Sequence, residues 1–337
     1  MKKHGPSSPT DRHFTCRRYR RPVLLRAAFL SALVFALVAC SAPEGRTGPQ
    51  ASAGQQPAAA DWQAVGRALG KEGALQPGDV YKVSLPRSDL QVTAGGVQLK
   101  PALALGSWVA FKRTGGDAMV MGDLVLTEDE VTPVMTKLQA GGVERTALHN
   151  HVLRESPRVM YMHIGAHGDA VQIARAIHDA LALSKTPLTA PTGAPAGGSQ
   201  NQDIGIDPKQ LDQIMAQAGK VNGGVYQFSI PRAEAVSDGG MEVPPAMGLA
   251  TAINFQPTGG GKAAVTGDFV LVAGEVNPVI KALRENGIEV TALHSHMLTE
   301  SPRLFFMHFW ADDDAQRLAR GLRAALDKMN IAKPQTK

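Results

Sequence analysis

The sequence predicts an α+β fold made of two tandem homologous domains, each a mainly antiparallel sheet with packed helices. Two observations support this prediction. The segment "TALHNHVLRESPRVMYMH", residues 146–163, returns as "TALHSHMLTESPRLFFMH", residues 291–308, with twelve of eighteen positions identical. The same offset of 145 relates Tyr81 to Tyr226 and Pro133 to Pro278. One long period with two units indicates domain duplication rather than a solenoid of short repeats.

Local patterns predict the elements of each copy. In the first copy, helices are expected where an acidic start precedes an amphipathic run: residues 61–70, 128–142 and 169–183. Strands are expected where β-branched and aromatic residues alternate with polar ones: residues 80–87, 107–113, 118–126, 144–153 and 158–164. The last two strands form a hairpin. The second copy repeats this order.

The N-terminus has the pattern of an export signal. Residues 1–39 combine a basic leader with the apolar run "AAFLSALVFALVA", residues 27–39, which is too short to span a bilayer. The run ends in "LVAC", which resembles the lipobox of bacterial lipoproteins and predicts lipidation of Cys40. An ordinary cleaved signal peptide is the alternative. We therefore expect an exported protein, lipid-anchored to the cell membrane or outer membrane and facing the periplasm or exterior.

Composition divides the remaining chain and limits its partners. We expect a lipidated flexible tether at 40–60, a first domain at 61–184, a Pro/Gly/Ala-rich linker at 185–202 and a second domain at 203–330. The net charge of +5 comes from the leader, which holds eight basic residues and one acidic residue. No basic stripe remains to indicate nucleic-acid binding, so the expected partners are the membrane and a small anionic ligand or envelope protein.

The repeated hairpin concentrates the histidines. Eight histidines follow residue 39, and six of them lie in the two hairpins: His149, His151, His163, His294, His296 and His308. Alternate residues of a strand share a face about 7 Å apart. If the loop is Arg154–Arg158, then His149 lies opposite His163 and three imidazoles of one copy converge.

Three imidazoles with an open position suit a transition metal, with zinc first and iron, manganese or copper as alternatives. With Cys16 in the leader and Cys40 in the anchor, the ligands must be nitrogen and oxygen. We expect one ion per domain. The nearest carboxylates are Glu155 and Glu300, and Asp123 and Asp268 are the second choice.

Other interpretations remain open. The histidines are also compatible with a metal-dependent enzyme, a hydrolase or oxygenase acting on an envelope substrate, or with a metal-free ligand-binding module. No catalytic residue is identified. Arg158 and Arg303 either bind an anion or form a clip with the glutamate three residues earlier, and Arg87 and Arg232 bind an anion or lie in a surface turn.

The two hairpin segments, each preceded by a "GD" pair and a proline-containing helix, resemble the LppY/LpqO family of uncharacterised bacterial lipoproteins. The resemblance covers residues 61–184 and 203–330 and includes both H-x-H pairs and both trailing histidines. It implies export, lipid anchoring and a duplicated domain. It implies no particular activity and no catalytic residues.

Overall fold

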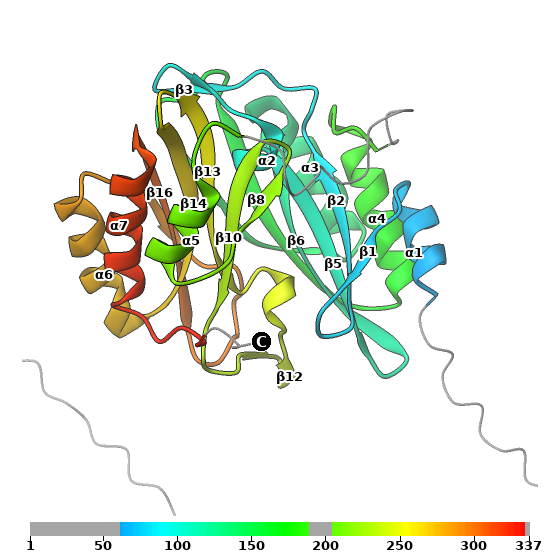
Figure 1. The fold of residues 1–337 in the computed structure, drawn as a ribbon. Helices are drawn as coiled ribbons and strands as arrows, with labels where there is room; N and C mark the ends of the chain where they lie inside the picture. The colour runs from blue at the N-terminus through cyan, green and yellow to red at the C-terminus, as the bar shows by residue number, and fades with distance from the viewer. Residues whose placement is uncertain (1–60, 189–203, 334–337) are drawn as a thin grey trace, which may run out of the picture. The chain divides into compact units, whose positions relative to one another are not determined.

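A computed structural model describes residues 61–188 and 204–333, which together lie in one compact unit (Figure 1). The predicted signal peptide, Cys40, the tether and most of the predicted linker fall outside the described residues. Among the helices of the two described ranges, none is both long enough and apolar enough to cross a bilayer.

Both copies have the same order of helices and strands. The first copy contains α1 Trp62–Leu69, β1 Ala74–Gln76, β2 Val80–Pro86, β3 Thr93–Ala94, β4 Val97–Gln98, α2 Pro101–Ala104, β5 Gly106–Thr114, β6 Asp117–Thr127, α3 Glu128–Ala140, β7 Glu144–His149, β8 Val159–Gly168 and α4 Ala170–Leu181. The second copy contains α5 Pro208–Met215, β9 Lys220–Asn222, β10 Val225–Pro231, β11 Ser237–Asp238, β12 Met241–Glu242, η1 Pro245–Met247, β13 Ala250–Gly259, β14 Lys262–Val272, α6 Ala273–Glu285, β15 Glu289–His294, β16 Leu304–Asp314 and α7 Ala315–Leu326.

The predicted α+β class is confirmed. Each copy forms a six-stranded antiparallel sheet, with strand order β1-β2-β5-β6-β8-β7 in the first copy and β9-β10-β13-β14-β16-β15 in the second. Capping explains where the helices begin. The Asp61 carboxylate accepts a hydrogen bond from the Gln63 backbone N–H at 2.9 Å, and Gly70 ends α1 with φ of 82°.

Helices cover one face of each sheet. In the first copy, Leu69 of α1, Leu138 of α3 and Ile177 of α4 pack on the sheet in one buried cluster. The second copy has the corresponding cluster under α5, α6 and α7. Figure 1 shows α1 and α4 on one side of the strands and α6 and α7 on the other. The helices of each copy therefore cover only one face of its sheet, and the other face remains free to pack against another part of the chain.

The uncovered faces pack against the opposite copy. Residues 87–105 of the first copy and 232–249 of the second lie between β2 and β5 and between β10 and β13, respectively. Leu103 of the first segment packs with Val225 and Ala264 of the second copy. Met247 of the second segment packs with Met119 and Met121 of β6. The two copies thus exchange segments and share their inner core.

Polar contacts fix this exchange. The buried Gln256 side chain accepts a hydrogen bond from Lys100 N–H at 2.8 Å and donates one to the Gln98 carbonyl at 2.7 Å. In the other direction, the Lys82 ammonium donates to the Ala246 carbonyl at 3.2 Å. These contacts tie each exchanged segment to the opposite copy.

Candidate metal centre

The strand register of the first hairpin differs from the predicted one. In the structure, His149 of β7 lies opposite Tyr161, and Ala147 lies opposite His163, with an irregularity between Arg145 and Ala147. The loop has nine residues rather than five, so the predicted pairing of His149 with His163 is wrong by two positions. Because a shift of two preserves the face, the two rings still lie on the same side, with centroids 5.0 Å apart.

The second histidine of each H-x-H pair lies outside the strand. β7 ends at His149, and the following bend brings the ring of His151 to 5.1 Å from that of His149, closer than the roughly 7 Å expected along a strand. The His151 ring stacks on Tyr161 with centroids 3.3 Å apart. In the second copy, His296 stacks in the same way on Phe306 at 3.4 Å.

The two hairpins meet and form one histidine cluster. The ring centroids of His149 and His294 are 3.5 Å apart. Two further stacked pairs join the copies: His151 with His308 at 3.7 Å, and His163 with His296 at 3.8 Å. We refer to the six rings as the histidine cluster. Each copy therefore contributes half of one continuous cluster rather than an isolated set of three rings.

Two equivalent threonines hold the hairpins together. The Thr146 hydroxyl donates to the His296 carbonyl at 2.6 Å, and the Thr291 hydroxyl donates to the His151 carbonyl at 2.5 Å. Each bond fixes the backbone of a cluster histidine from the opposite copy. Sequence reasoning missed both threonines, although they begin the repeated "TALH" and their identity in both copies was the available signal.

Backbone carbonyls orient the imidazoles. Nδ1 of His308 lies 2.7 Å from the Gly267 carbonyl oxygen, and Nδ1 of His149 lies 3.1 Å from that of Asn150. A ring whose Nδ1–H donates to a carbonyl has its free lone pair on Nε2. Within residues 61–188 and 204–333, none of the six Nε2 atoms has a hydrogen-bond partner, and all six are buried. His149, His294 and His308 thus have one anchored and one free nitrogen, a pattern typical of metal-ligating histidines, whereas both ring nitrogens of His296 lack a hydrogen-bond partner among the described residues.

Two aspartates supply the acid. Asp123 lies opposite His163 across β6 and β8, and Asp268 lies opposite His308 across β14 and β16. Asp123 Oδ2 is 3.6 Å from His151 Nε2. Asp268 Oδ2 is 3.1 Å from His296 Nε2, close enough for an ion pair but not aligned for a hydrogen bond. Both aspartates retain an Oδ1 atom without a hydrogen-bond partner among the described residues. The second-choice acids are therefore the ones that the fold brings to the rings.

The first-choice acids lie elsewhere. Of the ligand groups that the described residues form, none includes Glu155 or Glu300. The Glu300 carboxylate is buried, accepts a bond from Leu304 N–H at 3.0 Å and lies 3.2 Å from the Arg303 guanidinium. Glu300 and Arg303 thus clip the hairpin loop, as one of the two interpretations of this pair expected. Arg158 is exposed and pairs with Glu128 at 3.5 Å.

Four sets of three side chains have donor atoms within 4.8 Å of one another: His149–His151–His308, His149–His163–His294, Asp123–His151–His163 and Asp268–His294–His308. Two of these sets combine both copies and two lie within one copy. The donors are imidazole nitrogen and carboxylate oxygen, which fit zinc, iron, manganese or copper. The residues present therefore fit a bound transition metal.

Burial keeps the histidines neutral, as metal ligands must be. It lowers the pKa of His149 and His294 to about 4. It also holds the pKa well below the usual value in the other four: His151, His163, His296 and His308. For Asp123, burial and then the charge of Asp268 raise the pKa to about 8; burial raises that of Asp268 to about 7. Metal-free, the centre is thus poor in charge.

One cation near the cluster breaks the symmetry of the copies. Lys82 of β2 lies on the inner face, with its ammonium 4.0 Å from the Trp108 ring centroid. Burial lowers its pKa to about 8, and its positive charge acts on Asp123. The equivalent position of the second copy holds Gln227. Sequence reasoning gave no sign of Lys82, because nothing local links β2 to the hairpin.

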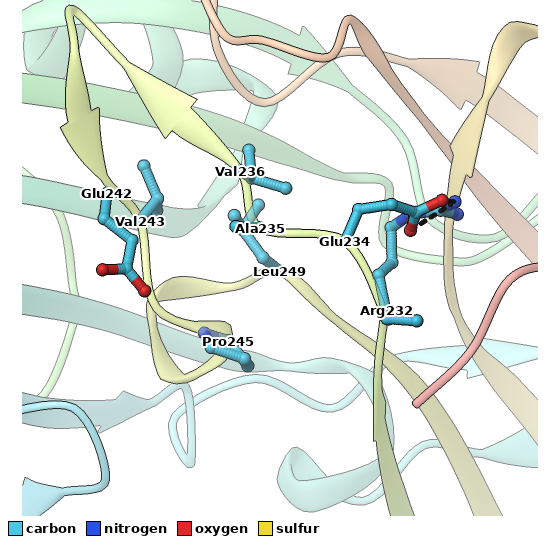
Figure 2. A pocket seen from close by; sticks show the side chains of 9 residues that line it. Arg232, Glu234, Ala235, Val236, Glu242, Val243, Pro245 and Leu249 are labelled. Atoms are coloured by element: carbon cyan, nitrogen blue, oxygen red, sulfur yellow. Dashed lines mark hydrogen bonds and ion pairs between the residues drawn. The ribbon is translucent and has the colours of Figure 1, made fainter. Parts of the chain in front are cut away.

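Arg87 and Arg232 are structural rather than exposed. Arg87 is fully buried and donates to Glu130 at 2.7 Å, and Arg232 donates to Glu275 at 2.6 Å. The predicted surface turn is therefore wrong for both. Arg232 also lines a hollow of about 250 Å³ that contains no member of the histidine cluster. Figure 2 shows its guanidinium paired with Glu234 at the edge of this hollow.

The chain belongs to the family described as Domain of Unknown Function (DUF1259), which matches residues 63–183 and 209–328. The tandem copies of one domain are thus shown.

No curated protein matches the chain significantly. Two solved structures match part of it. One is a trimeric bacterial microcompartment shell protein, PduB, with 13% identity over 76% of this chain and 91% of that chain and a TM-score of 0.19. The other is EtuB from Clostridium kluyveri, with 10% identity over 76% and 88% and a TM-score of 0.18. TM-scores this low do not indicate a shared fold.

Proposed function

We propose that this protein binds a transition metal ion in the histidine cluster between its two copies. The observation that carries the proposal is the set of six buried Nε2 atoms without a hydrogen-bond partner among the described residues. Leaving one buried polar group unpaired costs about 1–3 kcal/mol. A metal ion uses these lone pairs and offsets that cost.

Zinc is the first choice of ion. Neutral imidazoles with one or two carboxylates are its ordinary ligands when thiolates are absent. Iron, manganese and copper accept the same donors, so the ion that the purified protein retains decides between them. Because the fold places Asp123 and Asp268 beside the rings, we assign these aspartates rather than the two hairpin glutamates as the oxygen ligands.

The proposed setting is the cell envelope. The lipobox-like "LVAC" and the basic leader favour an exported chain anchored through Cys40, as the resemblance to the LppY/LpqO family also implies. In that setting the protein buffers, delivers or senses the ion. Radiolabelled palmitate incorporation that is lost in Cys40→Ala tests the anchor; equal labelling of both chains contradicts it.

Elemental analysis tests metal binding. The full chain, purified with a tag that contains no histidine, is expected to retain at least one transition metal ion, or to take one up on titration. Replacing His151 and His294 together by alanine removes a member of each of the four donor sets and should abolish uptake. His167→Ala is the matched control, since His167 is exposed and contacts only the Thr114 hydroxyl at 2.9 Å among the contacts described. A correctly folded chain that neither contains nor takes up metal refutes the proposal.

A further inference from the structure

The histidine cluster has more ligands than one metal ion uses. Six imidazoles and two carboxylates converge, and the Nε2 atoms and the two Oδ1 atoms all lack hydrogen-bond partners in the described ranges. A zinc ion in a protein takes about four ligands, and an octahedral ion takes six. A single ion would therefore leave between two and four buried donor groups unsatisfied, each at a cost.

The duplication arranges the six rings as two related triads. The first triad is His149, His151 and His308, whose donor atoms lie within 4.8 Å of one another. Exchanging the copies converts it into a second triad: His294, His296 and His163. Each triad draws two rings from one hairpin and the third ring from the other. The rings therefore offer a second, similarly arranged place for an ion, although the donor atoms of this second triad do not all lie within 4.8 Å of one another among the described residues.

Ring separations show that the triads match. In the first triad, the ring centroids are 3.7 Å apart for His151–His308, 5.1 Å for His149–His151 and 5.2 Å for His149–His308. The corresponding separations in the second triad are 3.8 Å, 5.1 Å and 5.5 Å. The second triad thus reproduces the first to within 0.3 Å.

The aspartates lie between the triads. Asp123 Oδ2 is 3.6 Å from Nε2 of His151 in the first triad, and its Oδ1 is 4.0 Å from Nε2 of His163 in the second. Asp268 Oδ2 is 3.1 Å from Nε2 of His296 in the second triad, and Asp268 also has a carboxylate oxygen within 4.8 Å of the His308 donor in the first. Each carboxylate therefore faces both triads, as a bridging ligand must.

We propose that the centre is dinuclear: each triad holds one metal ion, and Asp123 and Asp268 bridge the two ions. This inference rests on the proposed metal binding and specifies its stoichiometry and ligand set. It uses all eight donor groups, three imidazoles and a share of two carboxylates for each ion. Because each triad needs both hairpins, neither copy holds its ion alone.

Stoichiometry and magnetic coupling test the proposal. Native mass spectrometry and calorimetry of the full, histidine-tag-free chain should show that it binds two zinc ions. Loaded with Mn²⁺, it should give an exchange-coupled electron paramagnetic resonance spectrum, because bridged ions lie about 3.5–4 Å apart. His151→Ala and His296→Ala each remove one triad and should each retain one ion, with an uncoupled Mn²⁺ spectrum. His167→Ala should retain two.

The outcomes separate this inference from metal binding itself. Saturation of the unmodified chain by a single ion, with an uncoupled Mn²⁺ spectrum, overturns the dinuclear centre and leaves the proposed function intact. Uptake of no ion overturns both. Two ions without magnetic coupling overturn the aspartate bridge. If either alanine variant fails to fold, the stoichiometry and spectrum of the unmodified chain still decide.

Discussion

The imidazole rings of His149 and His294 stack with their centroids 3.5 Å apart, although they occupy the same position in two different copies. Both rings have a buried Nε2 atom without a hydrogen-bond partner among the described residues, and their donor atoms lie within 4.8 Å of each other and of that of His163. The pair thus joins the two halves of the cluster by packing, and in the proposed centre it supplies one ligand to each triad.

His149→Phe separates these two roles. Phenylalanine preserves an aromatic ring against His294 but removes one ligand nitrogen. We expect zinc affinity to fall at least tenfold, about 1.4 kcal/mol, while the thermal midpoint of the metal-free protein changes little. His294→Phe should give the same loss, because the copies are equivalent here. Calorimetry at equal ionic strength measures both, and unchanged affinity in either variant argues against ligation by this pair.

The stability of the metal-free protein should pass through a maximum near pH 7. Burial lowers the histidine pKa values in the folded state, with about 4 for His149 and His294, from 6.5 in the unfolded chain. Between these pH values the unfolded state binds more protons, so stability falls as pH falls. The aspartates act oppositely: with folded pKa values of about 8 and 7, against 3.8, their contribution grows as pH falls from 8.

Below pH 6.5, the stability lost through the six histidines exceeds the stability gained through the two aspartates. At about 1.4 kcal/mol per net proton and pH unit, the slope approaches roughly 5 kcal/mol per pH unit near pH 5. Urea midpoints measured in EDTA from pH 8 to pH 5 give the profile. A chain with both His151 and His296 replaced by phenylalanine should show a shallower acid limb. A flat profile from pH 7 to pH 5 contradicts neutral, buried histidines.

Local sequence patterns were sufficient for the long helices and strands of each copy, but not for the short β1, β3, β4 and α2 or for the contacts between copies. The helix cap at Asp61 and the alternating burial along Val80–Pro86 are encoded within a few residues. The exchange of residues 87–105 and 232–249 depends on shape complementarity between distant segments, and no local period records it. The sequence therefore predicted two domains correctly without indicating that they share an inner core.

The sequence also predicted only part of the candidate site: its histidines and, as a second choice, the aspartates beside them, but not the strand register. The repeated spacing identified all six histidines, and strand alternation placed His149 and His163 on one face. The fold brings the second-choice acids to the rings and not the first-choice ones, because Glu155 is near the histidines only in sequence, whereas Asp123 is their neighbour across the sheet. The register was wrong because the irregularity between Arg145 and Ala147 and the nine-residue loop leave no simple sequence signal.

Glu130→Gln should destabilise the protein without affecting metal binding. The Glu130 carboxylate pairs with the fully buried Arg87 at 2.7 Å. Asp89 pairs with the same guanidinium at 2.9 Å and stays in the variant, so we expect a loss smaller than the cost of an unpaired buried charge, about 3–5 kcal/mol. Glu128→Gln is the matched control, because Glu128 and Arg158 are exposed and such pairs contribute about 0–1 kcal/mol. Urea unfolding measures both; equal effects of the two substitutions contradict the structural role of the Arg87 pair.

Gln256→Ala should weaken the association of the copies. Its buried amide serves the Lys100 N–H and the Gln98 carbonyl, so alanine leaves two backbone groups of the exchanged segment without their partner. We expect the free energy of unfolding to fall by about 2 kcal/mol. Relative to the unmodified chain, amide hydrogen exchange in the variant should accelerate more at residues 87–105 than in β6. Gln91→Ala, at an exposed position of the same segment, is the control, and uniform exchange in Gln256→Ala argues against a local role.

Lys82→Gln should strengthen metal binding at the centre. The substitution gives the first copy the residue found at Gln227 and removes a cation whose charge acts on Asp123. Without the ammonium, nothing at this position repels a bound cation. We therefore expect the zinc dissociation constant at pH 7 to fall severalfold, which corresponds to about 1 kcal/mol of binding free energy.

The gain should disappear at high pH, because the pKa of Lys82 is lowered to about 8 and the neutral amine no longer repels the ion above that value. Calorimetric titrations at pH 7 and well above pH 8 measure this dependence. Lys112→Gln serves as the control: its ammonium donates to the Glu242 carbonyl at 2.8 Å in a similar contact between the copies, but no influence of its charge on Asp123 is found. A gain that is the same at both pH values, or that Lys112→Gln shares, would mean that altered packing between the copies, and not the charge of Lys82, changes the affinity.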